Sequence, residues 1–410
     1  MQEIIDKIKN AGGCIYLVGG AVRDELMGRK VNDRDYCVTG IDFEQFVRMF
    51  PDANVRGKDF PVFDMIGSEF ALARIERKIG IGHKGFEIDA NKNVSIEQDL
   101  ERRDITINSI ARNLITGELI DPFGGLKDIK NKVIRATSNA FVEDPLRAYR
   151  VARFSAQLGF EVEDNTIKLI NKLKPELLSI SKERVFTEFR KALNTEKPSV
   201  FFEVLKNANI LDVHFREIYD LIGVEQPIKY HPEGDAYNHT LEVVDRASKE
   251  TTNLEIRFSA LVHDLGKGIT PKELYPHHHG HDNAGVKVVE NFCRRIGAPN
   301  SWKKCGKTSA KEHMIGGFFW QMTTPKQVDF LERVDKSILG LNGLQIVVNA
   351  DKAENANKNL FSDLKKPILE EINGEYIKQK YGVEEWTKLK ELLRQERIRK
   401  LKTLKQEIKT

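Results

Sequence analysis

One stretch, Tyr16–Gly40, constrains the fold and chemistry of this 410-residue chain more than any other, and it reads YLVGGAVRDELMGRKVNDRDYCVTG. The apolar run Cys14–Val18 ends at Gly19 and Gly20. This pattern predicts a buried strand followed by a turn at which the backbone can approach a ligand closely. A phosphate is the natural ligand there, because free N–H groups between a loop and the start of a helix attract anions.

Two aspartates, Asp33 and Asp35, open the next predicted strand, RDYCVTG, after a basic residue at Arg23. Residues two apart on a strand point to the same face, so both carboxylates are expected to project together. Such a pair can hold divalent metal ions beside a triphosphate. A plain turn and a solvated strand start would explain each feature singly. The combined pattern resembles the signature of the nucleotidyltransferase superfamily, which includes tRNA nucleotidyltransferases (CCA-adding enzymes) and bacterial poly(A) polymerases.

Composition describes an ordinary soluble protein of two to four domains, with 40% hydrophobic and 31% charged residues. No stretch approaches the ~20 consecutive apolar residues that a membrane-spanning helix needs. The N-terminal sequence MQEIIDKIKNAGG lacks the apolar core of a signal peptide, which predicts a cytoplasmic protein without a membrane partner. The four cysteines show no metal-ligand spacing.

The net charge of +4 permits nucleic-acid binding without requiring it, so the distribution of charge matters more than the total. Lys388–Thr410 carries nine Lys or Arg residues against three Glu residues. Its apolar residues recur at helical spacing, at Ile398, Leu401, Leu404 and Ile408. We interpret the segment as a basic amphipathic helix that packs through its apolar face, with an RNA-contacting arm as the alternative.

The pattern of the sequence changes near residue 125. Before this point we expect strands, including Ala71–Lys78, Phe86–Asn91 and a hairpin that turns at Thr116 and Gly117. From Lys127 onward helical periodicity dominates, in the segments Ala140–Leu158, Asn165–Leu178, Lys182–Leu193 and Val200–Ala208. The loop-like stretch Gly223–Gly234 precedes a further helical region and a charged helical tail.

Two segments add charged side chains suited to a nucleotide. The first places Arg102, Arg103 and Asp104 before an apolar stretch, where guanidinium groups can neutralise phosphate and a carboxylate can hold ribose hydroxyls. A solvated charge run is the alternative. Between the two lies DPFGGLKDI (Asp121–Ile129), which predicts a tight turn at the end of the α/β region.

The second segment is EDPLRAYRVARFSAQLGF (Glu143–Phe160), which predicts a helix with Asp144 near its cap and Pro145 in its first turn. Asp144, Arg147 and Arg150 would then share one face. An ordinary cap with an ion pair would explain this spacing. An Asp–Arg pair could instead read base edges, because cytosine and adenine present an amine beside a ring acceptor, whereas uracil and guanine present a carbonyl beside an N–H.

Residues 14–160 resemble the head and neck of a bacterial class II CCA-adding enzyme, through the ordered motifs LVGGAVRD, DRD, RRD, DPFGGLKD, EDPLR and RVARFSAQLGF. The resemblance implies addition of CCA to tRNA from CTP and ATP, with Mg²⁺ at the catalytic Asp33 and Asp35. It implies nucleotide binding by Gly20, Arg23, Arg103, Asp144, Arg147 and Arg150. It also implies that Ile79–Gly85 is a flexible loop that assists the switch from C to A, for which a surface hairpin is the alternative.

Eight of the ten histidines fall between His231 and His313. Imidazoles and carboxylates from separate helices can converge on a divalent ion, and the ordered set H…HD…H…H…D resembles the HD-type metal-dependent phosphohydrolases. By this resemblance the primary metal ligands are His239, His263, Asp264 and Asp351, with His263 and Asp264 catalytic. His281 and His313 would serve a second metal or the substrate. The expected metal is a divalent transition ion, with Ni²⁺ first. No further polar ligand is traced in MIGGFFWQ after His313, and the run His277–His279 can also be a solvated loop.

The predicted fold is α+β: a nucleotidyltransferase α/β head at 1–125, a helical neck and body at 126–224 that carries the base template and binds RNA, an HD phosphohydrolase domain at 225–340, and a helical tail at 341–410. The expected partners are tRNA, CTP and ATP, and the protein is expected to be a monomer, with a homodimer as the alternative. The HD domain of the multifunctional subtype implies phosphatase, 2′-nucleotidase and 2′,3′-cyclic phosphodiesterase activities. The alternatives are a poly(A) polymerase, a CC-adding enzyme, and a degenerate HD module that only binds RNA.

Overall fold

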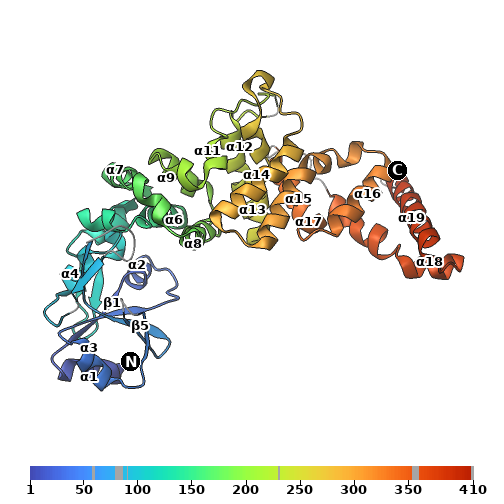
Figure 1. The fold of residues 1–410 in the computed structure, drawn as a ribbon. Coiled ribbons are helices and arrows are strands. Elements are labelled where there is room, and N and C mark those ends of the chain that lie inside the picture. The colour runs from blue at the N-terminus through green and yellow to red at the C-terminus, as the bar shows by residue number, and fades with distance from the viewer. Residues whose placement is uncertain (58–60, 79–85, 90, 230, 353–359, 408–410) are drawn as a thin grey trace. The chain divides into compact units, whose positions relative to one another are not determined.

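The computed structural model of the chain describes residues 1–57, 61–78, 86–89, 91–229, 231–352 and 360–407, and it divides into two units (Figure 1). Unit 1 comprises Met1–Glu188 and Val200–Val213, and unit 2 comprises Phe189–Ser199 and His214–Thr410. The first unit contains the main sheet and the second is helical, so the predicted α+β fold is confirmed. Among the described helices, none has the length and apolar character required to span a membrane.

Unit 1 is built on a mixed seven-stranded sheet in the order β3-β4-β5-β2-β1-β8-β9. These strands are β1 (Cys14–Val18), β2 (Asp35–Thr39), β3 (Asn54–Arg56), β4 (Val62–Met65), β5 (Ser68–Leu72), β8 (Ala111–Asn113) and β9 (Leu119–Ile120). β2 and β5 run parallel, whereas the other neighbouring strands are antiparallel. A separate antiparallel pair is formed by β6 (Ile75–Lys78) and β7 (Phe86–Asp89).

β1 is buried on both faces, as expected for a continuous apolar run in the middle of a sheet. The helices around it are α1 (Gln2–Asn10), α2 (Gly20–Leu26), α3 (Phe43–Met49) and α4 (Ile96–Glu101). Ile15 and Leu17 belong to the core that includes α1 and α3, whereas Tyr16 and Val18 belong to a second core that includes α4. β1 therefore contributes side chains to the hydrophobic cores on both faces of the sheet. The turn that follows it contains Gly19 and Gly20.

Two strand predictions need correction and one is confirmed. β2 begins at Asp35 rather than Asp33, so strand alternation does not set the direction of Asp33. The strand expected over 71–78 is interrupted after β5, because its partner β2 ends at Thr39 and β6 pairs with β7 instead. The hairpin between β8 and β9 is confirmed, with Gly117 in the left-handed region at φ +78°. The expected loop Ile79–Gly85 lies outside the described residues.

The neck of unit 1 consists mainly of short helices, and α6 is the longest of those that lie wholly within it. Its elements are η1 (Thr106–Asn108), α5 (Gly125–Asn131), β10 (Val133–Ile134), η2 (Asn139–Glu143), α6 (Arg147–Leu158), β11 (Glu161–Val162), α7 (Asp164–Lys172), η3 (Lys174–Ser179), α9 (Ser199–Asn207) and α10 (Leu211–His214). The parallel pair β10 and β11 brackets α6 in the sequence. α8 (Lys182–Leu193) begins in unit 1 and ends in unit 2.

The helix predicted over Ala140–Leu158 is wrong at one point, because it breaks at Asp144. η2 ends there, Asp144 adopts an extended conformation (φ −113°, ψ 108°), and α6 begins only at Arg147. Pro145 accounts for the break, since a proline disfavours helical dihedral angles in the residue before it. Asp144 Oδ1 instead accepts a hydrogen bond from the Leu146 N–H at 3.0 Å, which closes a turn.

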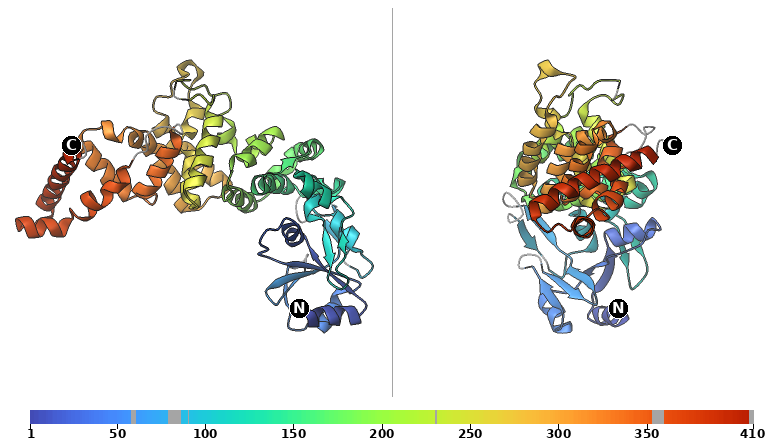
Figure 2. Two further views of the ribbon diagram at one scale, coloured as in Figure 1. Left: turned by 180° about the vertical axis from the view of Figure 1, so that it is seen from behind. Right: turned by 90° about the vertical axis from the view of Figure 1, so that its right-hand side faces the viewer.

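Unit 2 consists mainly of helices (Figures 1 and 2). They are α11 (Arg216–Tyr219), α12 (Ala236–Glu250), α13 (Leu254–Val262), η4 (Leu265–Ile269), η5 (Lys272–Leu274), α14 (His281–Ile296), α15 (Asn300–Gly317), η6 (Phe319–Gln321), α16 (Thr324–Asp335), α17 (Gly340–Asp351), η7 (Phe361–Leu364), the π-helical η8 (Lys365–Glu370), α18 (Gly374–Tyr381) and α19 (Trp386–Glu407). A Cβ on Gly266 would lie 2.0 Å from the His281 carbonyl oxygen, so glycine is required where η4 meets α14.

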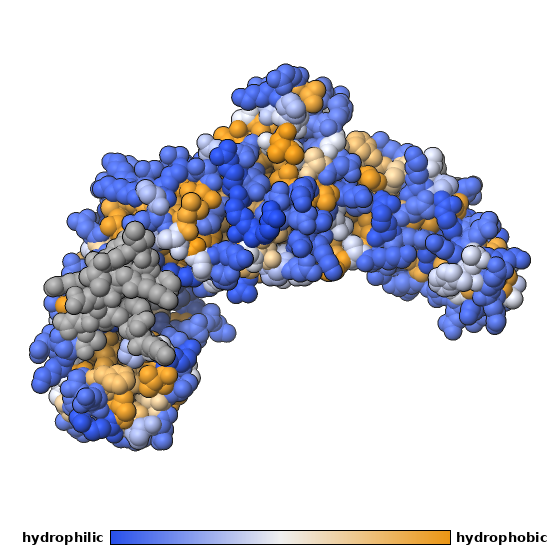
Figure 3. Space-filling view, viewed as in Figure 1, coloured by the Kyte–Doolittle hydropathy of each residue, from blue (hydrophilic) through white to orange (hydrophobic). Residues whose placement is uncertain are grey.

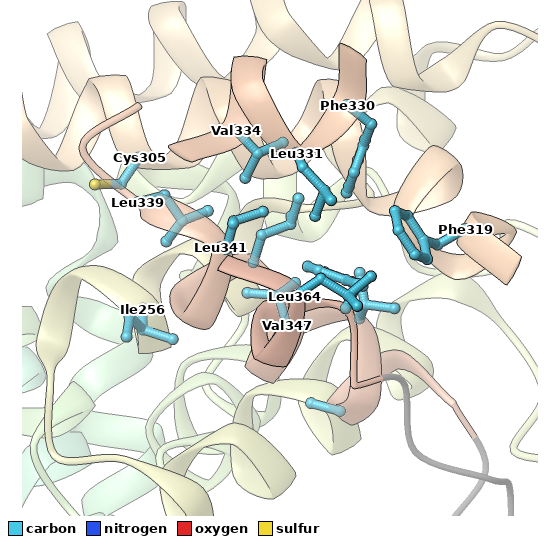
Figure 4. Close-up of a cluster of buried hydrophobic side chains, with 14 of the residues drawn as sticks. Ile256, Cys305, Phe319, Phe330, Leu331, Val334, Leu339, Leu341, Val347 and Leu364 are labelled. Atoms are coloured by element: carbon cyan, nitrogen blue, oxygen red, sulfur yellow. The ribbon is translucent and has the colours of Figure 1, made fainter. Parts of the chain in front are cut away.

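A hydrophobic core joins the last helices of unit 2 to the earlier ones. It includes Ile256 of α13, Leu331 of α16 and Val347 of α17 (Figure 4). Leu401 of α19 belongs to the same core and is 0% exposed, with Ile398 and Leu404 packed against it. The surface around α18 and α19 in Figure 3 is mainly hydrophilic. The packing predicted for this amphipathic helix is therefore confirmed at these three positions, whereas Ile408 lies outside the described residues.

We expect Leu401→Ala to destabilise unit 2 by about 2–5 kcal/mol, because removing a fully buried leucine side chain loses its burial and leaves a cavity. Hydrogen–deuterium exchange of the amides in α16, α17 and α19 in the full-length protein would measure the change. Lys402→Ala is the matched control, since Lys402 is the next residue of the same helix and is exposed. Equal protection in the two variants would contradict the assignment of Leu401 to the core.

Candidate active sites

An arginine-rich pocket of 730 Å³ lies in unit 1. Its described lining contains eight arginines and three aspartates, drawn from the turn after β1, from β2, from the segment after α4, and from the neck. The arginines are Arg23, Arg74, Arg102, Arg103, Arg147, Arg150, Arg153 and Arg184, and the aspartates are Asp35, Asp104 and Asp144. The volume falls in the range of small-molecule sites, and the excess of positive charge suits a polyanion such as a nucleoside triphosphate.

The Gly19–Gly20 turn brings the backbone close to two of these arginines. Gly19 has φ +71°, and a Cβ at this position would lie 3.1 Å from Arg103 Nη1. Arg23 is 4% exposed and donates a hydrogen bond from Nη1 to Asn108 Oδ1 at 2.8 Å. The side chain of Arg103 has a buried Nε–H without a hydrogen-bond acceptor. Gly20, Arg23 and Arg103 therefore lie around one corner of the pocket.

Buried carboxylates hold several of the arginines in place. Arg150 donates from Nε and Nη2 to Asp104 Oδ2, at 2.8 and 2.7 Å. Burial alone would raise the pKa of Asp104, but the charge and hydrogen bonds of Arg150 outweigh it and lower the pKa to about 2. Asp99 binds Arg102 and Arg103 at 2.6 and 3.0 Å in the same way. These ion pairs fix the positive side chains before any ligand binds.

The predicted template residues Asp144 and Arg147 lie in the pocket, but they are held by different contacts from those expected. The Asp144 carboxylate accepts from the Leu146 N–H at 3.0 Å and from Arg184 Nη2 at 3.3 Å. Arg147 donates to the carbonyl oxygens of Ala140 and Arg102, at 2.7 and 2.6 Å. A carboxylate that accepts and a guanidinium that donates are the complementary groups that a base edge with an amine beside a ring acceptor requires.

The two predicted magnesium ligands occupy different positions relative to the pocket. Asp35, the first residue of β2, lines it, whereas Asp33 precedes the strand and is not among the lining residues, and both side chains are exposed. Glu69 of β5 lies opposite Asp35 in the parallel pairing, and both line a second cavity of 150 Å³. Burial raises the pKa of Asp35, the charges of Glu69 and Asp33 raise it further, and Arg103 opposes them. Asp33 and Glu69 therefore both act on the charge of Asp35, although these three carboxylates do not form a compact group of ligand atoms like those in unit 2.

The predicted HD residues converge in unit 2. His239 lies on α12, His263 caps α13 and precedes Asp264, and Asp351 ends α17. One ligand atom from each of these four residues lies within 4.8 Å of the other three. The shortest contact joins His239 Nε2 to Asp351 Oδ1 at 2.8 Å, and His263 Nε2 lies 3.2 Å from Asp264 Oδ2. Within the described parts of the chain, every such compact group of three or more acidic, His or Cys ligand atoms lies in unit 2.

Asp264 also belongs to a second compact group of ligand atoms, which it forms with His281 and His313. Its Oδ1 lies 3.1 Å from His281 Nε2 and 3.3 Å from His313 Nε2, and the two imidazole Nε2 atoms are 3.4 Å apart. Asp264 therefore offers one oxygen to His239 and His263 and the other to His281 and His313. A carboxylate that bridges two sets of histidines is suited to two neighbouring metal ions, or to one ion and a substrate.

The cluster fits a transition metal ion. His263 Nε2 and Asp264 Oδ1 are buried and lack a correctly aligned hydrogen-bond partner. Burial lowers the pKa of His263, but the carboxylates of Asp264 and Asp351 outweigh it and raise that pKa above its usual value. A metal ion would replace the protons that these carboxylates now draw onto the imidazoles. Mixed imidazole and carboxylate ligands are typical of ions such as Ni²⁺, Zn²⁺ and Fe²⁺.

None of the three histidines of the HHH run, His277–His279, contributes a ligand atom to this cluster. His277 and His279 are exposed and their rings stack at 5.9 Å, whereas His278 is buried and its Nε2 lies 2.9 Å from the Glu225 carbonyl oxygen. His277 and His279 therefore match the solvated-loop interpretation.

Three protein-family models match consecutive parts of the chain. Residues 15–135 match the poly A polymerase head domain, residues 159–221 match a probable RNA- and SrmB-binding site of polymerase A, and residues 236–316 match the HD domain. The multifunctional CCA protein of Shewanella denitrificans is 48% identical over 346 residues, which cover 82% of this chain and 83% of that protein.

This chain belongs to the multifunctional CCA protein family. It is thereby a bacterial tRNA nucleotidyltransferase of the CCA-adding kind with an HD domain, as its motifs predict.

Solved structures of CCA-adding enzymes share the fold of this family member. One, a CCA-adding enzyme in complex with ATP, has a TM-score of 0.67 and 20% identity over 97% of this chain and 88% of that one. Another, the Thermotoga maritima CCA-adding enzyme complexed with tRNA, has a TM-score of 0.66 and 19% identity over 98% of this chain and 90% of that one. At this level of identity the likeness concerns the fold alone.

Sequence reasoning missed three candidate residues of this CCA protein family member. Glu69 faces Asp35 only because β2 pairs with β5. Lys267 lies one turn after the HD pair, and its Nζ contacts Asp264 Oδ2 and Gln226 Oε1, both at 2.6 Å. Glu233 contacts His239 from the preceding loop. The i,i+3 spacing of Asp264 and Lys267 was a usable signal, whereas Glu69 depends on a non-local strand pairing and Glu233 on the conformation of an irregular loop.

Asp104→Asn should weaken the dependence of head stability on pH. The folded-state pKa of Asp104, about 2, lies below the usual value of 3.8 for an aspartate, so the carboxylate stabilises unit 1 above about pH 4. This contribution, on the order of 2–3 kcal/mol, is lost as the pH falls from about 4 towards 2. Hydrogen–deuterium exchange of the amides in α4 and α6 between pH 3 and 6 would measure it.

The wild type should lose protection in α4 and α6 as the pH falls, and Asp104→Asn should be less protected at pH 6 and change less. Asp6→Asn serves as the control, because Asp6 is exposed on α1. Parallel curves for the wild type and Asp104→Asn would show that the ion pair with Arg150 does not stabilise the head.

Proposed function

We propose that this protein builds and repairs the 3′-terminal CCA of tRNA from CTP and ATP without a nucleic-acid template, and that its HD domain removes phosphate groups from damaged RNA ends. The observation that carries the first activity is the 730 Å³ pocket, in which Asp35, Arg103, Asp144 and Arg147 lie together. The compact histidine–aspartate cluster supports the second.

In the nucleotidyltransferase site, each predicted residue has a role that its surroundings allow. Arg23 and Arg103 bind the triphosphate beside the Gly19–Gly20 turn, where a glycine lets the backbone come close. Asp33 and Asp35 would hold Mg²⁺, and Glu69 is a third candidate ligand. When bound, the metal supplies activation of the RNA 3′ hydroxyl and stabilisation of the departing pyrophosphate.

Selection of the nucleotide would lie with Asp144 and Arg147. The carboxylate accepts from the exocyclic amine of cytosine or adenine, and the guanidinium donates to the adjacent ring acceptor. Uracil and guanine would place a carbonyl against the carboxylate and an N–H against the guanidinium. Arg184 supports this arrangement by holding the second oxygen of Asp144 at 3.3 Å. Arg150 is the last of the predicted nucleotide-binding residues, and its positive charge keeps the carboxylate of Asp104 ionised beside the site.

In the HD domain, His239, His263, Asp264 and Asp351 would hold the primary metal, with Ni²⁺ proposed first among the divalent transition ions. His281 and His313 would bind a second ion or the substrate. The bound metal supplies a nucleophilic water and neutralises phosphate charge. The proposed activities are those of a phosphatase, a 2′-nucleotidase and a 2′,3′-cyclic phosphodiesterase.

The two activities would act in sequence on one RNA end. A cyclic phosphate blocks the 3′ hydroxyl that the nucleotidyltransferase needs, so the hydrolase would reopen it first. We propose the division into a head at 1–125, a neck and body at 126–224 that bind RNA, an HD domain at 225–340 and a tail at 341–410. We also propose a cytoplasmic monomer, with a homodimer as the alternative. Because one enzyme must serve all tRNAs, it would read phosphates and shape rather than bases.

Asp144→Ala should relax base selection during CCA addition. A tRNA transcript that lacks its CCA end would be incubated with Mg²⁺ and each nucleotide alone or in mixture, and the products would be sequenced. The wild type should stop after C-C-A. Loss of the carboxylate should reduce discrimination against U and G by about 1–3 kcal/mol, since each well-placed base contact is worth about that much.

Asp164→Ala is the control for this experiment, because Asp164 is exposed at the start of α7 in the same unit. Unchanged selectivity in Asp144→Ala would reject the template role. Long A tails from the wild type would identify a poly(A) polymerase instead, and addition that stops after C-C would identify a CC-adding enzyme.

His263→Ala should abolish hydrolysis of RNA ending in a 2′,3′-cyclic phosphate and leave CCA addition to intact 3′ hydroxyl ends unchanged. His263 is fully buried within the cluster, so its removal eliminates a ligand without touching the head. Metal content and hydrolysis would be measured on the same full-length preparations, with His279→Ala as the control because His279 is an exposed histidine of the same domain.

Asp35→Ala gives the reciprocal test, since it should abolish addition and retain hydrolysis. A wild type without stoichiometric metal and without hydrolysis would identify the HD region as a degenerate RNA-binding module. Equal repair of cyclic-phosphate ends by the wild type and His263→Ala would disprove the proposed sequence of the two activities.

A further inference from the structure

Four histidines of the HD cluster share one orientation: each directs Nε2 into the cluster and Nδ1 away from it. Three of them place Nδ1 next to a backbone carbonyl oxygen. His263 Nδ1 lies 2.8 Å from Ala260 O, His281 Nδ1 lies 2.6 Å from His278 O, and His313 Nδ1 lies 3.0 Å from Ala310 O. A carbonyl oxygen only accepts, so in each of these residues Nδ1 carries a proton, and Nε2 is the nitrogen that can bind a metal in place of its own proton.

His239 is different, because its Nδ1 lies 2.6 Å from a carboxylate oxygen, Oε1 of Glu233. Glu233 belongs to the loop before α12, and its side chain is only 10% exposed. The end of this loop is fixed to the helix, since Asp235 Oδ1 accepts from the Asn238 N–H at 2.9 Å and Asp235 Oδ2 accepts from the Gly223 N–H at 2.6 Å. The carboxylate is therefore held against His239 by a structured segment.

A carboxylate has two effects that a carbonyl oxygen does not have to the same degree. Its negative charge makes the hydrogen bond from Nδ1–H stronger, which fixes the tautomer and the rotation of the ring. It also increases the electron density that Nε2 can donate to a metal. Among the described residues of the cluster, His239 is thus the ligand whose basicity depends on a side chain rather than on the backbone.

We propose that Glu233 is a positioning residue that orients His239 and sets the affinity of the HD cluster for its transition metal ion. The inference rests on the metal site of the proposed function. It assigns a role to a residue that does not touch the metal or the substrate and acts only through His239.

His231 offers a competing interpretation of the same carboxylate. His231 Nδ1 lies 3.1 Å from Glu233 Oε1, and its ring centroid lies 4.6 Å from that of His239. Ligand atoms of His231, Glu233 and His239 lie within 4.8 Å of one another, so these three residues could themselves form a metal site. In that case Glu233 would be a ligand. The proposal instead makes His231 a second hydrogen-bond donor to Glu233, and the two interpretations predict different effects of removing His231.

Metal affinity of the full-length protein provides the test. Metal-free wild type, Glu233→Ala and Glu233→Gln would be titrated with Ni²⁺ by calorimetry in competition with a chelator. Loss of a hydrogen-bond partner of this kind typically weakens metal binding by about 10–100-fold, which is the increase expected in the dissociation constant of Glu233→Ala. Glu233→Gln should show a smaller increase, because the amide oxygen still accepts the Nδ1–H without its charge. Glu225→Ala is the matched control, since it removes an exposed carboxylate from the same loop and should not change the affinity.

A spectroscopic readout separates positioning from a general loss of structure. In the Co²⁺-loaded protein, each bound imidazole contributes an exchangeable, hyperfine-shifted N–H proton signal. Glu233→Ala should shift or broaden the N–H signal of His239 and leave in place the signal of His263, the other histidine of the primary metal site, since its acceptor is a backbone atom. A partly unfolded variant would instead lose both signals.

Three outcomes overturn the inference, and they are distinguishable. A wild type that binds no transition metal rejects the HD function proposed above and the role of Glu233 with it. A wild type that binds metal, with equal affinity in Glu233→Ala, rejects only the positioning role. An equal loss in His231→Ala and Glu233→Ala identifies the trio as a separate metal site. A loss in Glu233→Ala, with wild-type affinity in His231→Ala and Glu225→Ala, supports the proposal.

Discussion

Both candidate sites depend on charges that are buried and already paired. An isolated buried carboxylate would be protonated or would destabilise the fold, so a site that keeps several of them ionised must supply partners from the protein. In unit 1 the partners are arginines, with Asp99 and Asp104 each held by guanidinium groups. In unit 2 they are Lys267 and the histidines around Asp264. The first site still has more arginines than carboxylates. The second contains buried ligand atoms without a correctly aligned hydrogen-bond partner, namely His263 Nε2 and Asp264 Oδ1.

The sequence alone located most of the candidate residues, because they occur in short local motifs. The HD pair lies at the end of one apolar helix, and Gly19–Gly20 follows one apolar strand, so each could be predicted without knowledge of the fold. Glu69 and Glu233 could not be found in this way. Glu69 faces Asp35 through a parallel strand pairing, and Glu233 reaches His239 across a loop that has no periodicity. The strand pairing depends on the packing of the whole unit, and the conformation of an irregular loop is not encoded in a periodic pattern.

The segment around Asp144 was predicted only in part: Asp144 lies just before α6, close to the predicted cap, but it does not share a helical face with Arg147 and Arg150. A single helix would have made the spacing of Asp144 and Arg147 rigid. Because Pro145 breaks the helix, Asp144 is held by a turn and by Arg184, whereas Arg147 is held by carbonyl oxygens at the start of α6. The two side chains are therefore fixed by separate contacts.

The basic C-terminal helix has a role inside unit 2 that its charge does not indicate. Leu401 packs in the same hydrophobic core as Leu344 and Val347 of α17, and α17 ends at Asp351. On the other side, Arg394 and Arg397 pair with Asp329 and Glu332 of α16. These contacts use the apolar face and part of the basic face for packing. α19 therefore supports the helix that delivers the last carboxylate to the HD cluster, and the geometry of that cluster depends on residues far along the chain from the HD motif itself.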